Sequence, residues 1–369
     1  MSGRVTMKDV AAALGVSTAT VSRALKDDPA ISLATRRAVA EVAQRVQYRP
    51  SAAARRLRTK STSLIGVVVQ SVGDGYIGEV VLGIQSRARD LGYQPLFFAA
   101  EGRAELESQA LDVFLSEQVT ELIAVSPGGH VPIQAVAEGM HVAIINGDEA
   151  VAARLIASVA SGVAAPSPRL GSRRRAEPMI KHIAFDDVGA GRLATSHLIE
   201  LGHRSFAHLR GPNVRSSLLR LLGYRQALTE AGLWPQPVLS AEPLMASREA
   251  AVAEFLREAT PPVAMVAYDD LSAVAALHAA HRVGWRVPAD LSVVGIDDIQ
   301  FAAYTNPGLT TVAQPKQRLG ALAVDAVIDR GESVPKVTVL DGQLVIREST
   351  ATVPAAEEGP AMGARGAAR

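Results

Sequence analysis

The sequence predicts an α/β protein, with a small helical head followed by a larger core that forms two lobes of parallel β-sheet. Residues 1–60 combine a helix-turn-helix pattern with a strong positive charge. From residue 64 onward, short apolar runs alternate with segments of helical spacing, as expected of parallel strands covered by helices. The alternation continues for about 290 residues, which favours two lobes over a single compact domain.

Two short helices joined by a glycine turn are predicted at the start of the chain. Thr6 can cap the first helix, and Asp9 stands in its first turn, where the helix dipole favours a negative charge. Gly15 permits a left-handed turn, and Ser17 can cap the second helix. A third helix is predicted over residues 32–47. This is the helix-turn-helix pattern, which lays its second helix in the DNA major groove.

The second helix has an apolar side and a polar side. The inward side is expected to comprise Val21, Ala24 and Leu25, packed on a stripe of Ile31, Val39, Val42 and Val46 around the third helix. The outward side comprises Thr18, Ala19, Ser22 and Arg23. Small side chains can approach base edges, and an arginine can donate two hydrogen bonds to a guanine. The alternative is a three-helix bundle that binds no DNA.

The positive charge of the chain is concentrated in this head. Residues 1–60 contain twelve Lys or Arg and four Asp or Glu, a net charge of +8, whereas the whole chain has a net charge of +1. The remainder of the chain is therefore acidic. Such an asymmetry is typical of a module that binds nucleic acid and favours the DNA-binding interpretation of the head.

A short alanine-rich segment follows the head. Pro50 and Ser51 can start a helix over residues 50–61, but a helix of about two turns is too short to be stable alone in water. Leu57 is an apolar residue in basic surroundings, like the wedges that enter a minor-groove base step. From the residues alone, a solvated linker whose leucine packs on the core is an equal alternative.

Several motifs together resemble the LacI/GalR family of transcriptional repressors over nearly the whole chain. They are Val-Ser-x-x-Thr-Val-Ser-Arg at residues 16–23, Pro-Ser through Ala-Arg-Arg-Leu at 50–57, Leu-Gly-His-Arg at 201–204, Ser-Val-Val-Gly-Ile-Asp-Asp at 292–298 and Leu-Thr-Thr-Val at 309–312. The resemblance implies a core like that of periplasmic binding proteins, a homodimer that binds a double-stranded operator, and Leu57 as the minor-groove wedge. The residues expected at the DNA are Thr6, Ser17, Thr18, Ala19, Thr20, Ser22, Arg23, Ser32, Tyr48, Ser51, Ala54, Arg55 and Leu57.

The elements of the core are predicted from apolar runs and helical spacing. Strands are expected at residues 64–69, 94–99, 122–125, 142–145, 182–185, 206–209, 264–267 and 293–296. Helices are expected at residues 77–91, 106–117, 190–201, 247–259 and 271–283. The resemblance implies three crossings between the lobes, which we place near residues 186–187, 298–306 and 314–319.

The expected domains are a DNA-binding head at residues 1–49, a hinge at 50–61 and the core at 62–353. An insertion at 150–178 and a tail at 354–369 are expected to lack regular structure, and the three consecutive arginines of the insertion are either solvated or a further DNA contact. The chain has no cysteine, no secretory signal pattern and no apolar run of about 18 residues. We therefore expect a soluble, cytoplasmic protein that does not associate with membranes.

One motif suggests a different function. Gly73, Gly75 and Gly78 form a G-x-G-x-x-G pattern after a predicted strand, and Glu101 ends the next strand. That combination is typical of a dinucleotide-binding site, so a nicotinamide-dependent α/β enzyme is one alternative, although a lone match is a weak signal. A sugar-binding transport protein, which shares the two-lobed core, is another. In the LacI/GalR family this loop lines the effector cleft, and Tyr76 keeps its usual aromatic residue.

The resemblance also implies an effector site between the lobes, formed by Tyr76, Asn146, Arg220, Asp269 and Asp297. Carboxylates, an amide and a guanidinium around an aromatic ring suit a sugar. A helix cap or an interlobe salt bridge is an open alternative for each aspartate. Leu218 stands where many relatives have a second arginine, which disfavours an anionic ligand, and Tyr268 replaces a small residue. We expect no catalytic residues, metal, cofactor or enzymatic activity, and we expect the ligand to change operator affinity.

Overall fold

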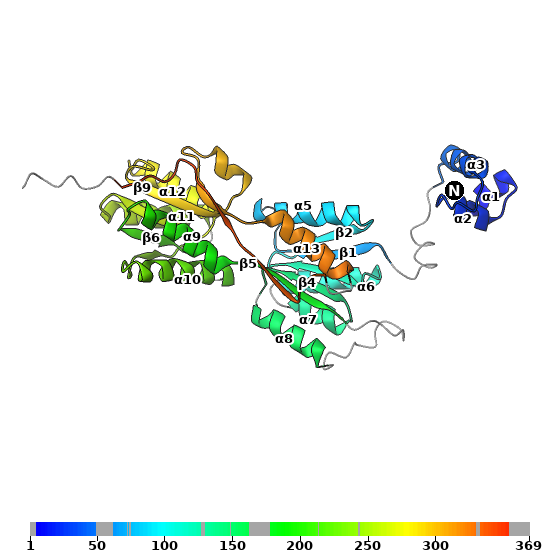
Figure 1. Cartoon of the computed structure of the whole chain (residues 1–369), viewed down its shortest axis with the longest axis horizontal. Coiled ribbons are helices and arrows are strands. Elements are labelled where there is room, and N and C mark those ends of the chain that lie inside the picture. The colour runs from blue at the N-terminus through cyan, green and yellow to red at the C-terminus, as the bar shows by residue number, and fades with distance from the viewer. Residues whose placement is uncertain are drawn as a thin grey trace, which may run out of the picture. The chain divides into compact units, whose positions relative to one another are not determined.

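The computed structural model describes residues 5–48 and 62–353, except residues 72, 74, 127–129, 148, 162–177, 213, 243 and 330–332. The chain divides into two compact units, Met1–Ser63 and Leu64–Arg369 (Figure 1). The predicted hinge at residues 50–61 and the predicted tail at 354–369 lie outside the described residues.

Three helices form the first unit. They are α1 (Met7–Leu14), α2 (Thr18–Ala24) and α3 (Leu33–Arg45). The carboxylate of Asp9 accepts hydrogen bonds from the backbone amide of Thr6 at 2.7 Å and from its hydroxyl at 2.8 Å, which fixes the first turn of α1. Gly15 ends α1 with a φ of 64°, the left-handed conformation that the sequence predicts.

A small apolar cluster holds these helices together. Val10 from α1, Val21 from α2 and Val39 from α3 are fully buried in it, and Ile31 and Val46 pack against its edge. The prediction that Leu25 turns inward is wrong, because this residue follows the last turn of α2 and is 36% exposed. The face of α2 opposite this cluster carries the exposed Thr18, Ala19 and Arg23.

Lobe 1 of the core is a six-stranded sheet with the order β11-β5-β4-β3-β1-β2, and the pairs within it are parallel. Its strands are β1 (Leu64–Val69), β2 (Gln94–Ala99), β3 (Glu121–Val125), β4 (His141–Ile145), β5 (Ile180–Phe185) and β11 (Val337–Leu340). Its helices are α5 (Gly75–Asp90), α6 (Ala104–Ser116), α7 (His130–Ala137), α8 (Glu149–Ala160) and α13 (Lys316–Ile328). Helices α5 and α13 lie side by side (Figure 1) and share one apolar cluster with β1, β3, β4 and β5.

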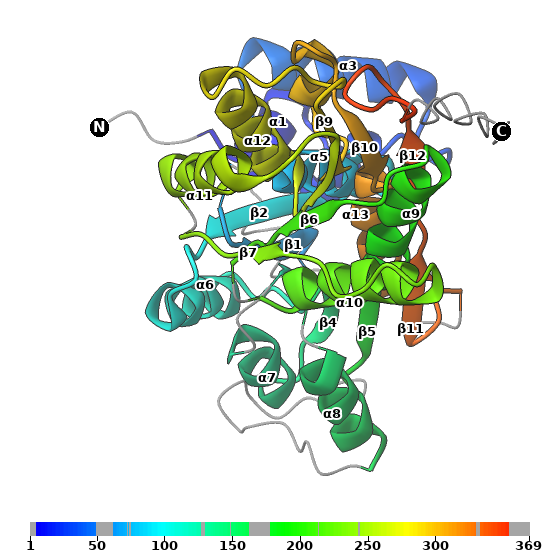
Figure 2. The same ribbon diagram turned by 90° about the vertical axis from the view of Figure 1, so that its left-hand side faces the viewer.

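Lobe 2 is a second six-stranded sheet, with the order β12-β10-β9-β8-β6-β7. Its strands are β6 (Phe206–Leu209), β7 (Val238–Leu239), β8 (Val263–Ala267), β9 (Leu291–Asp297), β10 (Thr310–Ala313) and β12 (Gln343–Val345). Its helices are α9 (Asp187–Glu200), α10 (Arg215–Glu230), α11 (Met245–Glu258), α12 (Asp270–Arg282) and the 3₁₀ helix η1 (Gln300–Tyr304). Helices α11 and α12 cover one face of this sheet and α9 and α10 cover the other (Figure 2), each with its own apolar cluster.

Two of the three expected crossings between the lobes are present. The chain passes from β5 to α9 at residues 186–187 and from β10 to α13 at residues 314–316. The crossing expected at residues 298–306 is wrong, because that segment returns through η1 to β10, which pairs with β9 in the same sheet. The third crossing is instead the short connection between β11 in lobe 1 and β12 in lobe 2, at residues 341–342.

Residues 150–178 were expected to lack regular structure, and for residues 150–160 this is wrong. Helix α8 occupies Glu149–Ala160, and Ala152 and Leu155 on it are buried against the sheet of lobe 1. Alanine favours helix, and these two residues lie three apart on the face that meets the core. Residues 162–177, which include the arginine run, lie outside the described residues.

Candidate functional site

The exposed side of α2 presents the side chains that the sequence predicts at the DNA. Thr18, Ala19 and Arg23 are exposed, and Ser22 and Thr20 are partly exposed. The hydroxyl of Ser17 accepts a hydrogen bond from the amide of Thr20 at 3.0 Å and thereby caps the helix. This geometry suits a helix that enters a groove by its N-terminal half, because small side chains stand there and the arginine follows one turn later.

Arg23 is already held in place within the head. Its Nε atom donates a hydrogen bond to Oδ2 of Asp28 at 2.8 Å, and the amide of Ala30 donates to Oδ1 of the same carboxylate. The hydrogen bond from Arg23 lowers the pKa of Asp28 below its ordinary value, so this carboxylate is charged at neutral pH. This pair was not predicted from the sequence, and it orients the guanidinium at the end of the exposed side of α2.

Other residues expected at the DNA have defined local roles. Thr6 and Ser32 are the N-cap residues that directly precede α1 and α3, and the Ser32 hydroxyl accepts from the amide of Thr35 at 3.1 Å. Tyr48 packs against the edge of the apolar cluster of the head. Their contact with DNA remains a prediction. Four further residues of the predicted interface lie outside the described residues, namely Ser51, Ala54, Arg55 and Leu57.

A cleft of about 630 Å³ lies between the two lobes, and all five residues of the predicted effector site line it. Most of its polar residues follow the carboxyl ends of strands, where ligands bind in open α/β sheets. Tyr268, which was singled out beside this site, lines the cleft as well. So do five polar residues that were not predicted there, namely Gln70, Ser126, Arg215, Ser216 and Gln314.

On the side of lobe 1, Tyr76 and Asn146 are joined. The Nδ2 atom of Asn146 donates to the hydroxyl of Tyr76 at 2.6 Å, and its Oδ1 accepts from the amide of Phe185 at 2.8 Å. The Asn146 backbone has a φ of 49°, a left-handed conformation that asparagine adopts more readily than most residues. The amide side chain therefore links the start of α5 to the end of β5, beside a crossing.

On the side of lobe 2, Arg220 is the centre of a buried charge cluster. Its Nε donates to Oδ1 of Asp187 at 2.7 Å, its Nη1 donates to the backbone oxygen of Tyr268 at 2.6 Å, and its Nη2 lies 3.3 Å from Oδ1 of Asp297. The guanidinium carbon also lies 4.8 Å from the centre of the Tyr268 ring. Burial alone would lower the pKa of Arg220, but Asp297 and Asp187 raise it, so the arginine is charged.

Asp297 has a second set of contacts. Its Oδ1 accepts from Nε2 of Gln314 at 2.5 Å, and its backbone oxygen accepts from the ammonium of Lys316. Burial raises the pKa of Asp297 well above its ordinary value, and Arg220 opposes this rise. Asp297 thus lies between an arginine of lobe 2 and a lysine of α13 in lobe 1.

Asp269 caps a helix, which was the alternative to a ligand contact for this residue. Its Oδ1 accepts from the amide of Ser272 at 2.7 Å at the start of α12, and the Arg248 guanidinium lies 3.6 Å away. The residue also lines the cleft, so a capping role and a ligand contact are compatible in this position. Leu218 is 49% exposed on α10 and is absent from the lining of this cleft.

Tyr268 closes one wall of the cleft. A Cβ atom on Gly211 would lie 2.2 Å from its Cδ1 atom, so the absence of a side chain there makes room for the ring. Its hydroxyl is 3.0 Å from that of Ser216 on α10. Tyr268 therefore supports Arg220 and Ser216 together.

The glycine pattern of the rival interpretation does not have the expected packing. A dinucleotide site needs its third glycine for close contact between helix and strand, yet a Cβ atom on Gly78 would meet nothing within 4 Å. Glu101 pairs with Arg103 at 3.1 Å. Within the described ranges, no group of three or more acidic or histidine side chains could hold a metal ion. In the same ranges, no helix has the length and apolar character needed to cross a membrane.

A helix-turn-helix head and a core of two parallel-sheet lobes around a polar cleft define a class of DNA-binding proteins with a periplasmic-binding-protein-like core. Comparisons agree with this class. Residues 6–51 match the model of the bacterial regulatory proteins of the lacI family, and residues 195–350 match the periplasmic binding protein-like domain.

Relatives of known function cover almost the whole chain. The transcriptional repressor CytR of Escherichia coli (strain K12) is 30% identical over 355 residues, which are 95% of this chain and 97% of CytR. The transcriptional regulator CelR of Thermobifida fusca is 33% identical over 357 residues, which are 94% of this chain and 98% of CelR. The lac repressor dimer bound to operator and the anti-inducer ONPF superimposes with a TM-score of 0.79 at 29% identity, over 95% of this chain and all of the repressor chain.

The chain therefore belongs to the LacI family of bacterial regulatory proteins. It is a DNA-binding transcriptional regulator, as the motifs predict. The predicted fold, a helix-turn-helix head with two lobes of parallel sheet, is confirmed.

Proposed function

We propose that this regulator is a repressor whose operator affinity is controlled by a neutral, polyhydroxylated ligand bound between the lobes. The observation that carries the proposal is the charge cluster around Arg220. Its guanidinium is paired with Asp187 at 2.7 Å and is 3.3 Å from Asp297, so the cluster has no net positive charge whichever state Asp297 is in. An anionic ligand would gain little there, whereas a sugar can both donate to the carboxylates and accept from the guanidinium.

The relatives support a sugar. A structure of CelR is a complex with cellobiose and superimposes with a TM-score of 0.63 at 28% identity, over 94% of this chain and all of the CelR chain. Tyr76 in the cleft supplies an aromatic surface, and Asn146, Gln70 and Ser126 supply the polar groups of lobe 1. These residues, with Arg220, Asp269 and Asp297, are the effector contacts that we propose.

The head supplies the DNA contacts in this proposal. The net charge of +8 over residues 1–60 attracts the phosphate backbone, and the exposed side of α2 reads the bases. We place the hinge at residues 50–61 and assign Leu57 to the minor groove, by the resemblance of that segment to the family. The protein would act in the cytoplasm, where the DNA is, and without enzymatic activity.

A homodimer is the assembly that we propose. A relative, the lac repressor, binds its operator as a dimer. In this chain Phe301 and Tyr304 on η1 are 72% and 79% exposed, and Leu82 on α5 is 54% exposed. Aromatic side chains of this kind are typical of interface centres, and two heads are needed for two half-sites.

A two-stage experiment tests the proposal. The operator is first selected from random double-stranded DNA with the full-length protein, and a panel of neutral sugars, sugar phosphates and NAD is screened by thermal shift. We expect a neutral sugar to raise the melting temperature and to change operator affinity at least about fivefold, the lower end of typical allosteric coupling. A shift with NAD or with a sugar phosphate, but with no neutral sugar, would refute the ligand class. Failure to select a sequence would refute operator recognition.

A further inference from the structure

Lys316 occupies a position between the two lobes that the cleft alone does not explain. It is the first residue of α13, immediately after the chain leaves lobe 2, and only 4% of its surface is exposed. Its Nζ atom donates to the backbone oxygens of Asp297 at 2.5 Å and of Asp298 at 2.7 Å. It also lies 3.1 Å from Oε1 of Glu79 on α5.

The partners of the Lys316 ammonium come from both lobes. A buried ammonium needs an opposite charge and hydrogen-bond acceptors, since otherwise the loss of hydration is unfavourable. Glu79 supplies the charge from lobe 1, and the two backbone oxygens supply acceptors from lobe 2. Lys316 therefore adds a side-chain connection between the two lobes, directly beside the chain crossing at residues 314–316.

The backbone that accepts these hydrogen bonds is in an unusual conformation. Asp297 has a φ of 126° and Asp298 a φ of 51°, which residues with side chains rarely adopt. Such conformations persist only where surrounding contacts hold them. Asp297 uses its backbone oxygen for Lys316 and its carboxylate for Gln314 and Arg220, so one residue connects the cleft with α13.

Helix α13 is packed tightly against α5. A Cβ atom on Gly83 of α5 would lie 2.1 Å from the backbone oxygen of Gln317, and one on Gly320 of α13 would lie 2.2 Å from that of Val80. Two backbones in such contact cannot slide past each other without a clash, so the helices move together. Tyr76 at the start of α5 faces the cleft, and Leu82 on the same helix is exposed.

A matching pair lies in lobe 2. A Cβ atom on Gly191 of α9 would lie 2.1 Å from the backbone oxygen of Arg220, and one on Gly223 of α10 would lie 2.0 Å from that of Val188. Arg220 is therefore fixed to a second rigid helix pair. Asp297 contacts Arg220 of this pair and Lys316 of the first pair.

We propose that Lys316, compensated by Glu79, is the positioning residue that joins Asp297 to the α5–α13 helix pair, so that a change in the Arg220–Asp297 contact displaces these two helices as one body. The inference rests on the proposed function for its purpose, which is to carry ligand occupancy from the cleft to lobe 1. The test of these contacts needs neither ligand nor DNA, so its outcome is independent of the ligand class proposed above.

The test measures the distance between the lobes in the full-length protein. The chain has no cysteine, so Ser86→Cys on α5 and Thr229→Cys on α10, both at exposed positions, give two unique sites for spin labels. Double electron–electron resonance then reports the distance distribution, with excess unlabelled protein to dilute any signal between protomers. The distribution is recorded with Asp297→Asn, with Lys316→Met and with both substitutions.

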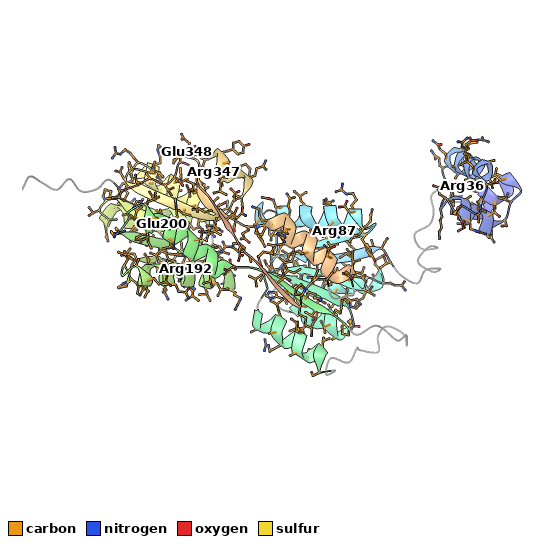
Figure 3. The ribbon with its side chains drawn as sticks, viewed as in Figure 1. Arg36, Arg87, Arg192, Glu200, Arg347 and Glu348 are labelled. Carbon is orange, nitrogen blue, oxygen red and sulfur yellow. The ribbon has the colours of Figure 1, made fainter. Side chains whose placement is uncertain are left out.

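A matched control comes from the same two helices. Arg87 on α5 donates to Asp325 on α13 at 2.7 Å, and Figure 3 shows it on lobe 1. This pair also joins the two helices, but neither of its side chains contacts Asp297. Arg87→Met therefore removes an ion pair from the helix pair without touching the connection. Glu79→Gln is the second test variant, because it removes the charge partner of Lys316 and is less disruptive than burying a methionine.

We expect Asp297→Asn to shift the mean distance by about 1–2 Å, the scale of helix displacements in such transitions. We expect the same substitution to cause no shift when Lys316→Met is present. Glu79→Gln should displace or broaden the distribution, and Arg87→Met should leave it unchanged. A merely structural role for Lys316 would lower the melting temperature without altering the effect of Asp297→Asn, and that result would overturn the proposal. Equal shifts with Arg87→Met and Glu79→Gln would overturn it as well.

Discussion

Arg23 and Asp28 form an ion pair at 2.8 Å on the surface of the head, with the arginine at the end of the exposed face of α2. The bond engages Nε and so fixes the plane of the guanidinium. Because an exposed arginine otherwise samples many rotamers, the pair reduces the conformational entropy that a base contact would cost.

The first prediction concerns base recognition by this pair. Arg23→Ala should weaken binding to the selected operator by about 1–3 kcal/mol and leave binding to random DNA almost unchanged. Asp28→Ala should strengthen binding to random DNA, since it removes a negative charge. It should still reduce the preference for the operator over random DNA, because Arg23 loses the partner that orients it. Fluorescence anisotropy on both DNAs measures this. Equal losses on operator and random DNA for Arg23→Ala would show a phosphate contact instead.

The second prediction concerns salt. The net charge of +8 in residues 1–60 implies that the logarithm of operator affinity falls linearly with the logarithm of salt concentration, by about 0.9 for each phosphate neutralised. Titrations between low and moderate ionic strength give the slope. A flat response would contradict an electrostatic role for the head.

The third prediction concerns the buried charge cluster. Arg220→Met leaves Asp187 and Asp297 without their cation, so it should lower the free energy of unfolding by about 3–5 kcal/mol. Asp297→Asn should cost less, because burial already raises the pKa of Asp297 and the amide keeps the side chain's size. Both variants should lose the response to sugar. Chemical denaturation and sugar titration measure the two effects, and a normal titration of Arg220→Met would remove this residue from the site.

The fourth prediction concerns acid stability. His208 on β6 is fully buried beside Tyr224, and burial lowers its pKa to about 3. It is therefore neutral in the folded protein, while in the unfolded chain it takes up a proton below a pH of about 6.5. The contribution of this neutral histidine to the free energy of unfolding is complete above a pH of about 6.5 and is lost as the pH falls toward about 3. The free energy of unfolding should therefore fall by about 2 kcal/mol between pH 7 and pH 5.

His208→Phe should remove that loss. Urea denaturation at pH 7 and pH 5 should show a smaller difference for the variant than for the wild type. His278→Gln is the control, because His278 is exposed and pairs with Glu249 at 2.7 Å. An unchanged pH dependence in His208→Phe would assign the acid sensitivity elsewhere.

The fifth prediction concerns assembly. Phe301→Asp combined with Tyr304→Asp places two charges where the proposed interface is apolar, and it should convert the dimer to a monomer in analytical ultracentrifugation. Operator affinity should then fall, since each head would bind its half-site alone. Val113→Asp on α6, another exposed apolar position at 39%, serves as the control. Dimers that persist in the double variant would place the interface on another surface.

The strands that were predicted most closely are those with continuous apolar runs. Leu64–Val69 and Gln94–Ala99 match at both ends. Leu64–Val69 lies in the interior of a parallel sheet, where strands are apolar on both faces, whereas Gln94–Ala99 is an edge strand whose apolar run Leu-Phe-Phe-Ala was sufficient to predict it. Val337–Leu340 was missed, because this short edge strand exposes alternate residues and does not form the continuous apolar run by which the other strands were predicted. The third crossing was misplaced for the same reason, since it begins at the end of that strand.

All five predicted effector residues line one cleft, but their partners could not be predicted. Asp187 and Arg220 are 33 residues apart in sequence, and Gln314 and Asp297 are 17 residues apart. Which of these side chains meet depends on how two helices and two sheets pack, and a single sequence contains no direct signal of that. The ion pair of Arg23 with Asp28 was missed although the two residues are only five apart, because Asp28 lies beyond the end of α2 and helical spacing does not predict its contacts.

The glycine contacts within the two helix pairs bear on how this chain can acquire new specificities. If each helix pair moves as one body, a displacement that starts in the cleft reaches the far end of that pair undiminished, whichever ligand produced it. Residues such as Gln70, Ser126 and Ser216 can therefore be exchanged to suit a different ligand while Gly83, Gly191, Gly223 and Gly320 stay in place. Recognition and transmission are separable in this architecture, and selection can alter what is sensed without rebuilding the response.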